Sequence, residues 1–197
     1  MNSKFIYSHA ENNALLLMLD ELHPSYQSIV IPTFAGLKLD FPKATLDKIE
    51  IYRGADDDRS LADASTPGVI KLNAYWFVDR DVEELRKEAQ TEYVLTNIDP
   101  NLPALRWHGG MTEPQHVLNH EFGHQLQDQI PGASEWTQEA WHEACFDQSL
   151  AVSGYSLSGP DEFWAEMFAA FRMSTLGDLA LSSDVMISFC SLFAGGL

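Results

Sequence analysis

The alternation of apolar and polar residues in the first sixty positions predicts one helix and two strands. Asn12 to Leu22 has the apolar spacing of a helix, and Ser28 to Ile31 is a short, mainly β-branched run that Pro32 stops. Lys48 to Tyr52 alternates with a period of two, as a half-buried strand does. We therefore predict a helix followed by two short strands.

The middle of the chain predicts a strand and a surface helix. Gly68 to Phe77 is rich in β-branched and aromatic residues and follows Pro67, which favours a strand. From Asp81 to Tyr93 apolar residues recur at helical spacing between Glu and Lys, which is typical of an amphipathic helix. The Pro- and Gly-containing segment from Asp99 to Gly110 predicts a loop.

The last third of the chain predicts three helices. Thr112 to Gln115 has the form of a capping box, so a helix is expected from there to about Gln129, before a Pro-Gly pair. Two further helices are predicted, one over residues 134–150 and one over residues 160–171.

Length and composition favour one globular domain over residues 1–197. Hydrophobic residues make up 45% of the chain and charged residues 21%, which is ordinary globular usage. A chain of this length buries about 70% of its unfolded surface. The mixture of strands and helices predicts an α+β fold, in which residues 1–60, 61–111 and 112–197 are three parts of a single domain.

The charge balance restricts the partners. The chain has 29 acidic and 12 basic residues, with a formal net charge of −17. Such a surface repels nucleic acids and bare anionic membranes, and it attracts metal cations and basic peptides. We therefore expect a protein or peptide substrate, with basic ones favoured, and no nucleic-acid partner.

The sequence shows no sign of a membrane span or of a disulfide framework. The longest apolar run, Ala14 to Leu19, is far shorter than the roughly 20 residues that a spanning helix needs. No standard secretory signal follows Met1, so the chain is expected to be cytoplasmic, exported by a non-classical route or part of a larger protein. The two cysteines, Cys145 and Cys190, are expected to be free and buried.

The segment His120-Glu121-Phe122-Gly123-His124 carries the candidate chemistry. Residues four apart share one helix face, so His120 and His124 can direct ring nitrogens at one zinc ion, Zn2+, about 2.0–2.1 Å away. Glu121 lies beside this face, where it can act as a general base toward water. His116 is one turn earlier, and a straight helix cannot bring three stacked histidines to one tetrahedral ion. The plainer alternative is an amphipathic helix with histidines and no metal.

A zinc site needs a third protein ligand, and two glutamates compete for this role. Glu143 lies nineteen residues after His124, in the second predicted helix. Glu162 lies in the first turn of the third predicted helix, and Glu166 follows one turn later on the same face. Spacing alone leaves both candidates open.

Together with Tyr155, these residues resemble the zinc metallopeptidases typified by the protease domain of anthrax lethal factor and by the clostridial Pro-Pro endopeptidases. The likeness covers residues 112–172. It rests on the motif at His120 to His124, on Tyr155, and on the run from Glu162 to Glu166, whose first residue follows Tyr155 by seven positions. The resemblance implies a zincin-like domain with a small twisted sheet, an HExxH helix and a C-terminal helix that bears a ligand glutamate.

The same resemblance implies a role for each site residue. It implies Glu162 as the third zinc ligand and Tyr155 as the hydroxyl that stabilises the oxyanion. It implies Glu166 as the carboxylate that orients His120 or His124. It also implies that Gly68 to Phe77 is the strand whose edge lies over the cleft and receives an extended substrate.

Two hypotheses about function follow from these residues. The first is a zinc-dependent endopeptidase, with Glu121 and Tyr155 as catalytic residues. The second is a non-catalytic zinc-binding or scaffold domain of a toxin or a phage particle protein. The presence of both Glu121 and Tyr155 favours the first hypothesis.

Overall fold

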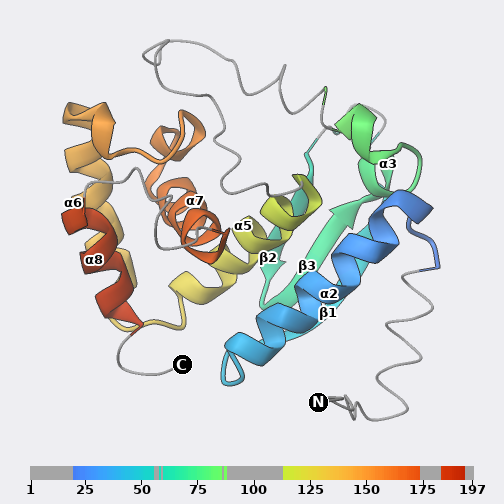
Figure 1. Ribbon diagram of the computed structural model, residues 1–197, viewed down its shortest axis with the longest axis horizontal. Coiled ribbons are helices and arrows are strands. Elements are labelled where there is room, and N and C mark those ends of the chain that lie inside the picture. Colours follow the sequence, from blue (N-terminus) through green and yellow to red (C-terminus); the bar gives the residue numbers. More distant parts are fainter. Residues whose placement is uncertain are drawn as a thin grey trace.

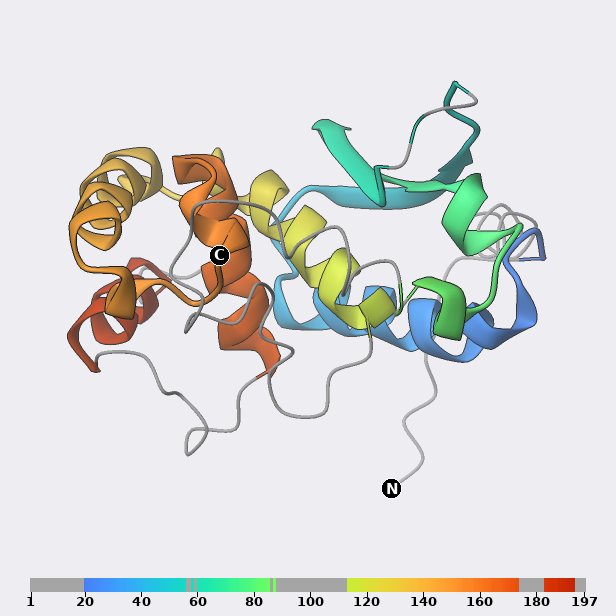
Figure 2. The same ribbon diagram turned by 90° about the horizontal axis from the view of Figure 1, so that it is seen from above.

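The computed structural model describes residues 20–55, 58, 60–85, 87, 113–173 and 183–193. These residues form a mixed α+β fold around a small sheet with the strand order β1-β3-β2, in which β3 is parallel to β1 and antiparallel to β2. Helices α2 and α5 pack beneath the sheet (Figure 2). The bounds of these elements are α2 (Pro24–Asp40), β1 (Leu46–Tyr52), β2 (Ala62–Thr66), β3 (Gly68–Asn73) and α5 (Glu113–Gln127).

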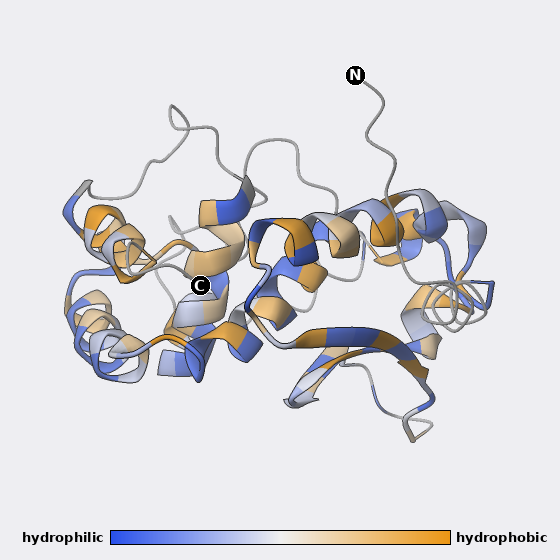
Figure 3. Ribbon diagram, turned by 90° about the horizontal axis from the view of Figure 1, so that it is seen from below, coloured by the Kyte–Doolittle hydropathy of each residue, from blue (hydrophilic) through white to orange (hydrophobic). Residues whose placement is uncertain are grey.

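The other long helices gather on the opposite side of α5, so that α5 runs through the middle of the molecule (Figure 1). Apolar and polar residues alternate along the helices and strands, as expected for elements that bury one side (Figure 3). The remaining elements are α3 (Ala74–Phe77), α6 (Ala133–Phe146), α7 (Pro160–Met173), α8 (Ser183–Leu192) and the short 3-10 helices η1 (Gln148–Leu150) and η2 (Tyr155–Leu157).

The strand predicted over Ser28 to Ile31 is wrong, because this segment lies inside helix α2. Pro24 opens the helix at a position where no N–H partner is needed, and His23 caps it by accepting a hydrogen bond from the Ser25 N–H. The buried residues of the helix are Tyr26, Val30, Phe34 and Leu37. Their spacing is helical, so burial of this face outweighs the β propensity of the run and the interior proline.

The strand predicted over Gly68 to Phe77 is correct only as far as Asn73. The Asn73 side chain accepts a hydrogen bond from the Tyr75 N–H and so caps α3, which turns the chain away from the sheet. Strand β3 also lies between β1 and β2, so it is not the edge strand that the resemblance implied. The edge strand that contacts α5 is β2, which the sequence pattern did not predict.

The predicted helix that starts near Thr112 is confirmed as α5 from Glu113 onward, and the third predicted helix is confirmed as α7. The second predicted helix ends at Phe146, earlier than expected, because Asp147 leaves the helical conformation and caps η1 through the Ser149 N–H. The loop predicted over residues 99–110 lies outside the described residues, as does the helix predicted over residues 12–22 except for residues 20–22, which form a turn.

One apolar core joins the sheet to the helices. Its largest fully buried side chains include Tyr26, Trp76, Phe122, Trp164 and Phe189 from the helices, together with Ile70 and Leu72 from β3. Both cysteines are free thiols as predicted, but Cys145 is exposed and Cys190 is only partly buried, so the prediction that both are buried is wrong. Within the described parts of the chain, no helix has the length and apolarity to cross a bilayer.

Helices α5 and α7 are in tight contact at Gly123. A Cβ atom built on Gly123 would lie 3.0 Å from the Ala165 Cα and 3.2 Å from the Phe168 Cβ. The Trp164 indole N–H donates a 2.7 Å hydrogen bond to the Gly123 carbonyl oxygen, which closes the contact with a buried bond. Only glycine therefore allows the two backbones to come this close.

We expect the substitution Gly123→Ala to lower the free energy of unfolding by about 1–3 kcal/mol, because the added methyl group has to push α7 away. Urea unfolding followed by circular dichroism measures this change. Gly159→Ala is the matched control, since its Cβ meets no atom within 4 Å and its effect should stay within about 0.5 kcal/mol. Equal stability losses in the two variants would contradict the assigned contact.

Candidate metal centre

Three side-chain donor atoms from α5 and α7 converge at one point. The Nε2 atoms of His120 and His124 lie 3.1 Å apart. The Glu162 Oε2 lies 3.0 Å from the first of these nitrogens and 3.6 Å from the second. This carboxylate oxygen is buried without a hydrogen bond of good geometry. All three atoms lie within 4.8 Å of one another, so this group can hold a metal ion.

The spacing along α5 explains why two histidines reach the same point. His120 and His124 are one turn apart on the helix, and their rings meet edge to face with centroids 4.8 Å apart. Glu162 comes from the first turn of α7, where a carboxylate is favoured by the positive end of the helix dipole. The contact at Gly123 sets the distance between the two helices.

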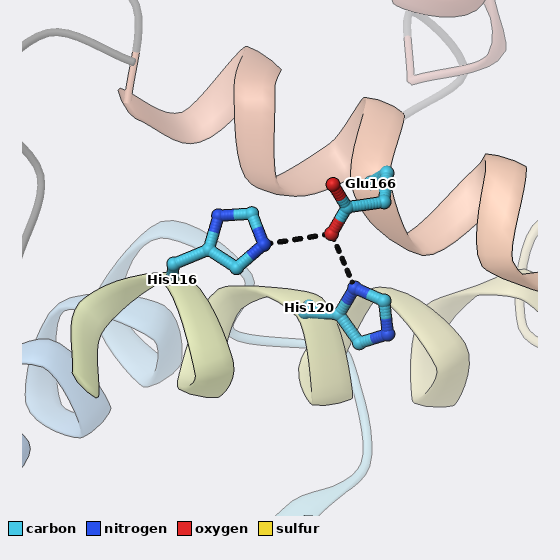
Figure 4. Close-up of side chains that lie close together, drawn as sticks. All are labelled: His116, His120 and Glu166. Atoms are coloured by element: carbon cyan, nitrogen blue, oxygen red, sulfur yellow. Dashed lines mark hydrogen bonds and ion pairs between the residues drawn. The ribbon is translucent and has the colours of Figure 1, made fainter. Parts of the chain in front are cut away.

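Glu166 fixes the other side of the His120 ring. Its Oε1 atom accepts hydrogen bonds from His120 Nδ1 at 2.8 Å and from His116 Nε2 at 2.7 Å (Figure 4). A proton on the Nδ1 of His120 leaves the Nε2 to face His124 and Glu162. Glu166 is only 2% exposed, so this carboxylate is held in place as a buried acceptor.

The second oxygen of Glu166 is held by the segment before η2. The Ser153 hydroxyl donates a 2.7 Å hydrogen bond to Glu166 Oε2, and it accepts one from the Ser156 N–H at 3.1 Å. The Ser156 hydroxyl in turn donates to the Ser153 carbonyl at 2.6 Å. The turn that carries Tyr155 is thus bonded to the carboxylate that orients His120.

An open cavity of about 570 Å³ lies over the three converging atoms. Glu121 and Tyr155 line this cavity together with His120, His124 and Glu162. The Tyr155 ring lies 5.8 Å from the His120 ring, measured between centroids. Strand β2 forms another wall through Ala62, Asp63, Ala64 and Ser65, and the rest of the lining is Ser60, Gln127, Asp128, Ser134 and Asp161. In the described part of the chain, every charged lining residue other than histidine is acidic.

Burial and proximity shift the pKa of each ionisable group at this centre. Burial acts to lower the pKa of His120, but the contacts with Glu162 and Glu166 outweigh it and raise this pKa to about 10. Burial acts to raise the pKa of Glu162 and Glu166, and the neighbouring histidines nevertheless hold both well below the usual range. Burial raises the pKa of Glu121, although His120 and His124 oppose the shift.

His120 is shared by two groups of possible metal ligands. The first is His120, His124 and Glu162, and the second is His116, His120 and Glu166. In the second group, both imidazoles have one carboxylate oxygen as hydrogen-bond acceptor, and all three residues are buried. The first group borders the cavity and includes a carboxylate oxygen without a hydrogen bond. The first group is therefore better suited to a metal ion that substrate can reach.

The structure separates the two glutamates that competed for the third position. Glu162 joins the two histidines, whereas Glu143 lies on α6 beside a different pocket, formed with residues of α8 such as Val185 and Ser188. His116, which the sequence placed outside the ligand set, is buried against Glu166. Sequence reasoning did not identify Ser153, because no pattern marks a lone serine in a loop.

Comparisons with known proteins are sparse. No protein-family model matches the sequence, and no curated protein matches it. A solved structure of a proposed zinc-binding metallo-peptidase from Bacteroides caccae is similar, with 13% sequence identity and a TM-score of 0.42. The match covers 98% of this chain and 73% of that one. A likeness this distant assigns no activity.

The metal-free protein should be most stable between about pH 4.5 and 6.5. The raised pKa of His120 contributes stability that is complete below pH 6.5 and is lost as the pH rises toward about 10. The lowered pKa values of Glu162 and Glu166 contribute stability that is complete above pH 4.5 and is lost in acid. The raised pKa of Glu121 acts in the opposite sense to those of the other two carboxylates, because it costs stability as the pH rises above about 4.5.

Urea unfolding in the presence of a chelator, repeated from pH 3 to pH 10, measures this profile. In Glu166→Gln the acid-side loss should shrink, because one of the two carboxylates with a lowered pKa is then absent. A free energy of unfolding that rises steadily from pH 6.5 to pH 9 would contradict the assignment.

Proposed function

We propose that this protein is a zinc-dependent endopeptidase, with zinc held by His120, His124 and Glu162. The convergence of the two Nε2 atoms and the buried Glu162 Oε2 at the base of an open cavity is the observation that carries this proposal. Two imidazoles and one carboxylate are a common ligand set of catalytic zinc, which leaves a fourth position for water or substrate. The proposal places the chain in the zincin-like group that its motif and Tyr155 resemble.

The residues fit such an ion in charge as well as in position. The three ligands carry one negative charge in their metal-binding forms, and Glu166 holds the Nδ1 proton of His120, so that Nε2 is available. A bound zinc ion would supply Lewis acidity, which acidifies water and polarises a peptide carbonyl.

The remaining chemistry belongs to side chains that line the cavity. Glu121 takes a proton from the attacking water and returns it to the leaving amine nitrogen, and its raised pKa suits a group that has to hold this proton. The Tyr155 hydroxyl donates a hydrogen bond to the carbonyl oxygen as negative charge develops on it. Both residues border the same cavity as the proposed ligands.

The charge of the cavity supports a basic peptide as substrate. Asp128 and Asp161 stand exposed on its lining, one turn after His124 on the α5 side and immediately before Glu162 on α7. A Lys or Arg side chain near the scissile bond would therefore meet two carboxylates. This selectivity rests on the proposed peptidase activity.

Replacement of the general base tests the mechanism. We expect Glu121→Gln to bind zinc with a stoichiometry near one and to lose about 10²- to 10⁴-fold in kcat/KM, because the amide cannot take the proton. A chelator should stop peptide cleavage by the unmodified protein, and added zinc should restore it. Full cleavage by zinc-loaded Glu121→Gln would refute this role, whereas zinc binding with no cleavage of any peptide by the unmodified protein would favour the non-catalytic alternative.

Two histidine variants locate the metal. Elemental analysis of His124→Ala should show loss of bound zinc, since only two of the three ligands remain. His116→Ala should retain about one zinc ion per chain with an affinity reduced by about 10- to 100-fold, because His116 supports His120 through the shared carboxylate of Glu166. The reverse result, with zinc lost from His116→Ala and kept by His124→Ala, would place the ion in the buried group instead.

A further inference from the structure

Gln125 binds the backbone of the hairpin formed by β2 and β3, whose strand β2 forms one wall of the cavity. Its side-chain amide nitrogen donates hydrogen bonds to the carbonyl oxygens of Ala64 and Thr66, the second at 3.1 Å. Its side-chain oxygen accepts a 2.7 Å hydrogen bond from the Gly68 N–H. Gln125 is 8% exposed, so these bonds are shielded from water. One side chain thus holds two carbonyl groups of β2 and the N–H of the first residue of β3.

The hairpin needs this attachment because its own pairing is interrupted. Ala62 and Asp63 pair with β3, but the register shifts between Asp63 and Thr66, so the ladder is irregular where the strand borders the cavity. β2 is an edge strand, with β3 on one side only. A strand with one partner and an irregular ladder opens more readily than a central strand.

The position of Gln125 on α5 gives this attachment a functional meaning. Gln125, which binds β2, directly follows the proposed zinc ligand His124 on the same helix. The helix forms the base of the cavity and β2 forms a wall, through Ala64 among others. Gln125 therefore ties the base of the cavity directly to its wall.

We propose that Gln125 is a positioning residue for substrate: it holds β2 at a fixed distance from the helix that carries His120 and His124, and so sets the width of the cavity. This role rests on the proposed peptidase function, because a cavity of set width matters only if a peptide has to fit between β2 and the metal centre. Gln125 itself takes no part in proton transfer.

The variant Gln125→Leu removes all three hydrogen bonds at nearly constant volume. We expect amide hydrogen exchange in residues 62–68 of the metal-free protein to accelerate at least about tenfold, with little change in α5. For the zinc-loaded enzyme we expect KM for peptide substrates to rise about fivefold or more, because the substrate meets a looser wall. The kcat and the zinc affinity should stay within about twofold of the parent values.

Gln129→Leu is the matched control. Gln129 lies in the turn that follows α5. Its side-chain oxygen accepts a 2.7 Å hydrogen bond from the Thr45 N–H, and its amide donates to the Gln125 carbonyl. Its loss should affect stability without raising KM or the exchange of residues 62–68. If Gln125→Leu does not fold, Gln125→Asn keeps the amide on a shorter side chain and should show the same changes to a smaller extent.

Several outcomes would overturn the proposal. Unchanged exchange in residues 62–68 would show that Gln125 does not hold the strand. A loss of zinc affinity with unchanged KM would show that Gln125 acts on His124 rather than on the wall. A parent protein that binds zinc and cleaves no peptide removes the proposed function, and the exchange comparison with Gln129→Leu then still decides whether Gln125 holds β2.

Discussion

The contact between α5 and α7 at Gly123 is the constraint on which the candidate site depends. The donor atoms of His120 and His124 come from α5, and that of Glu162 comes from α7. These atoms are close together only because no side chain separates the two helices at Gly123. A wider spacing would move Glu162 away from the histidines and Glu166 away from His120. The geometry of the site therefore depends on a packing contact whose residue, Gly123, has no side chain that could bind a metal ion or react.

The sequence predicted the parts of this site that depend on local geometry. His120 and His124 meet because residues four apart share a helix face, and the capping signal at the start of α5 and the proline at the start of α7 marked the helices. Spacing could not choose between Glu143 and Glu162, because that choice depends on which helix packs against α5. The resemblance suggested Glu162, and the structure brings it to the histidines; its role as a ligand stays a proposal.

The sheet was harder to predict because its strands depend on their partners. Ala62 to Thr66 lacks the β-branched alternation of a strand and is held by β3 and by Gln125. Ser28 to Ile31 has high β propensity and is nevertheless helical, since Val30 is buried at helical spacing from Tyr26 and Phe34. Gln125 and Ser153 act through backbone groups and side chains distant in sequence, so no local pattern could reveal them.

The division of the donor atoms between α5 and α7 has a consequence for how the protein would acquire and keep its ion. An isolated α5 presents two imidazoles, and the third donor arrives only when α7 docks, so tight capture would follow folding rather than precede it. Occupancy would then tie the two helices together, and through Ser153 it would also steady the turn that carries Tyr155. A copy that lost its ion would loosen at these junctions first and become the easier target for cellular degradation.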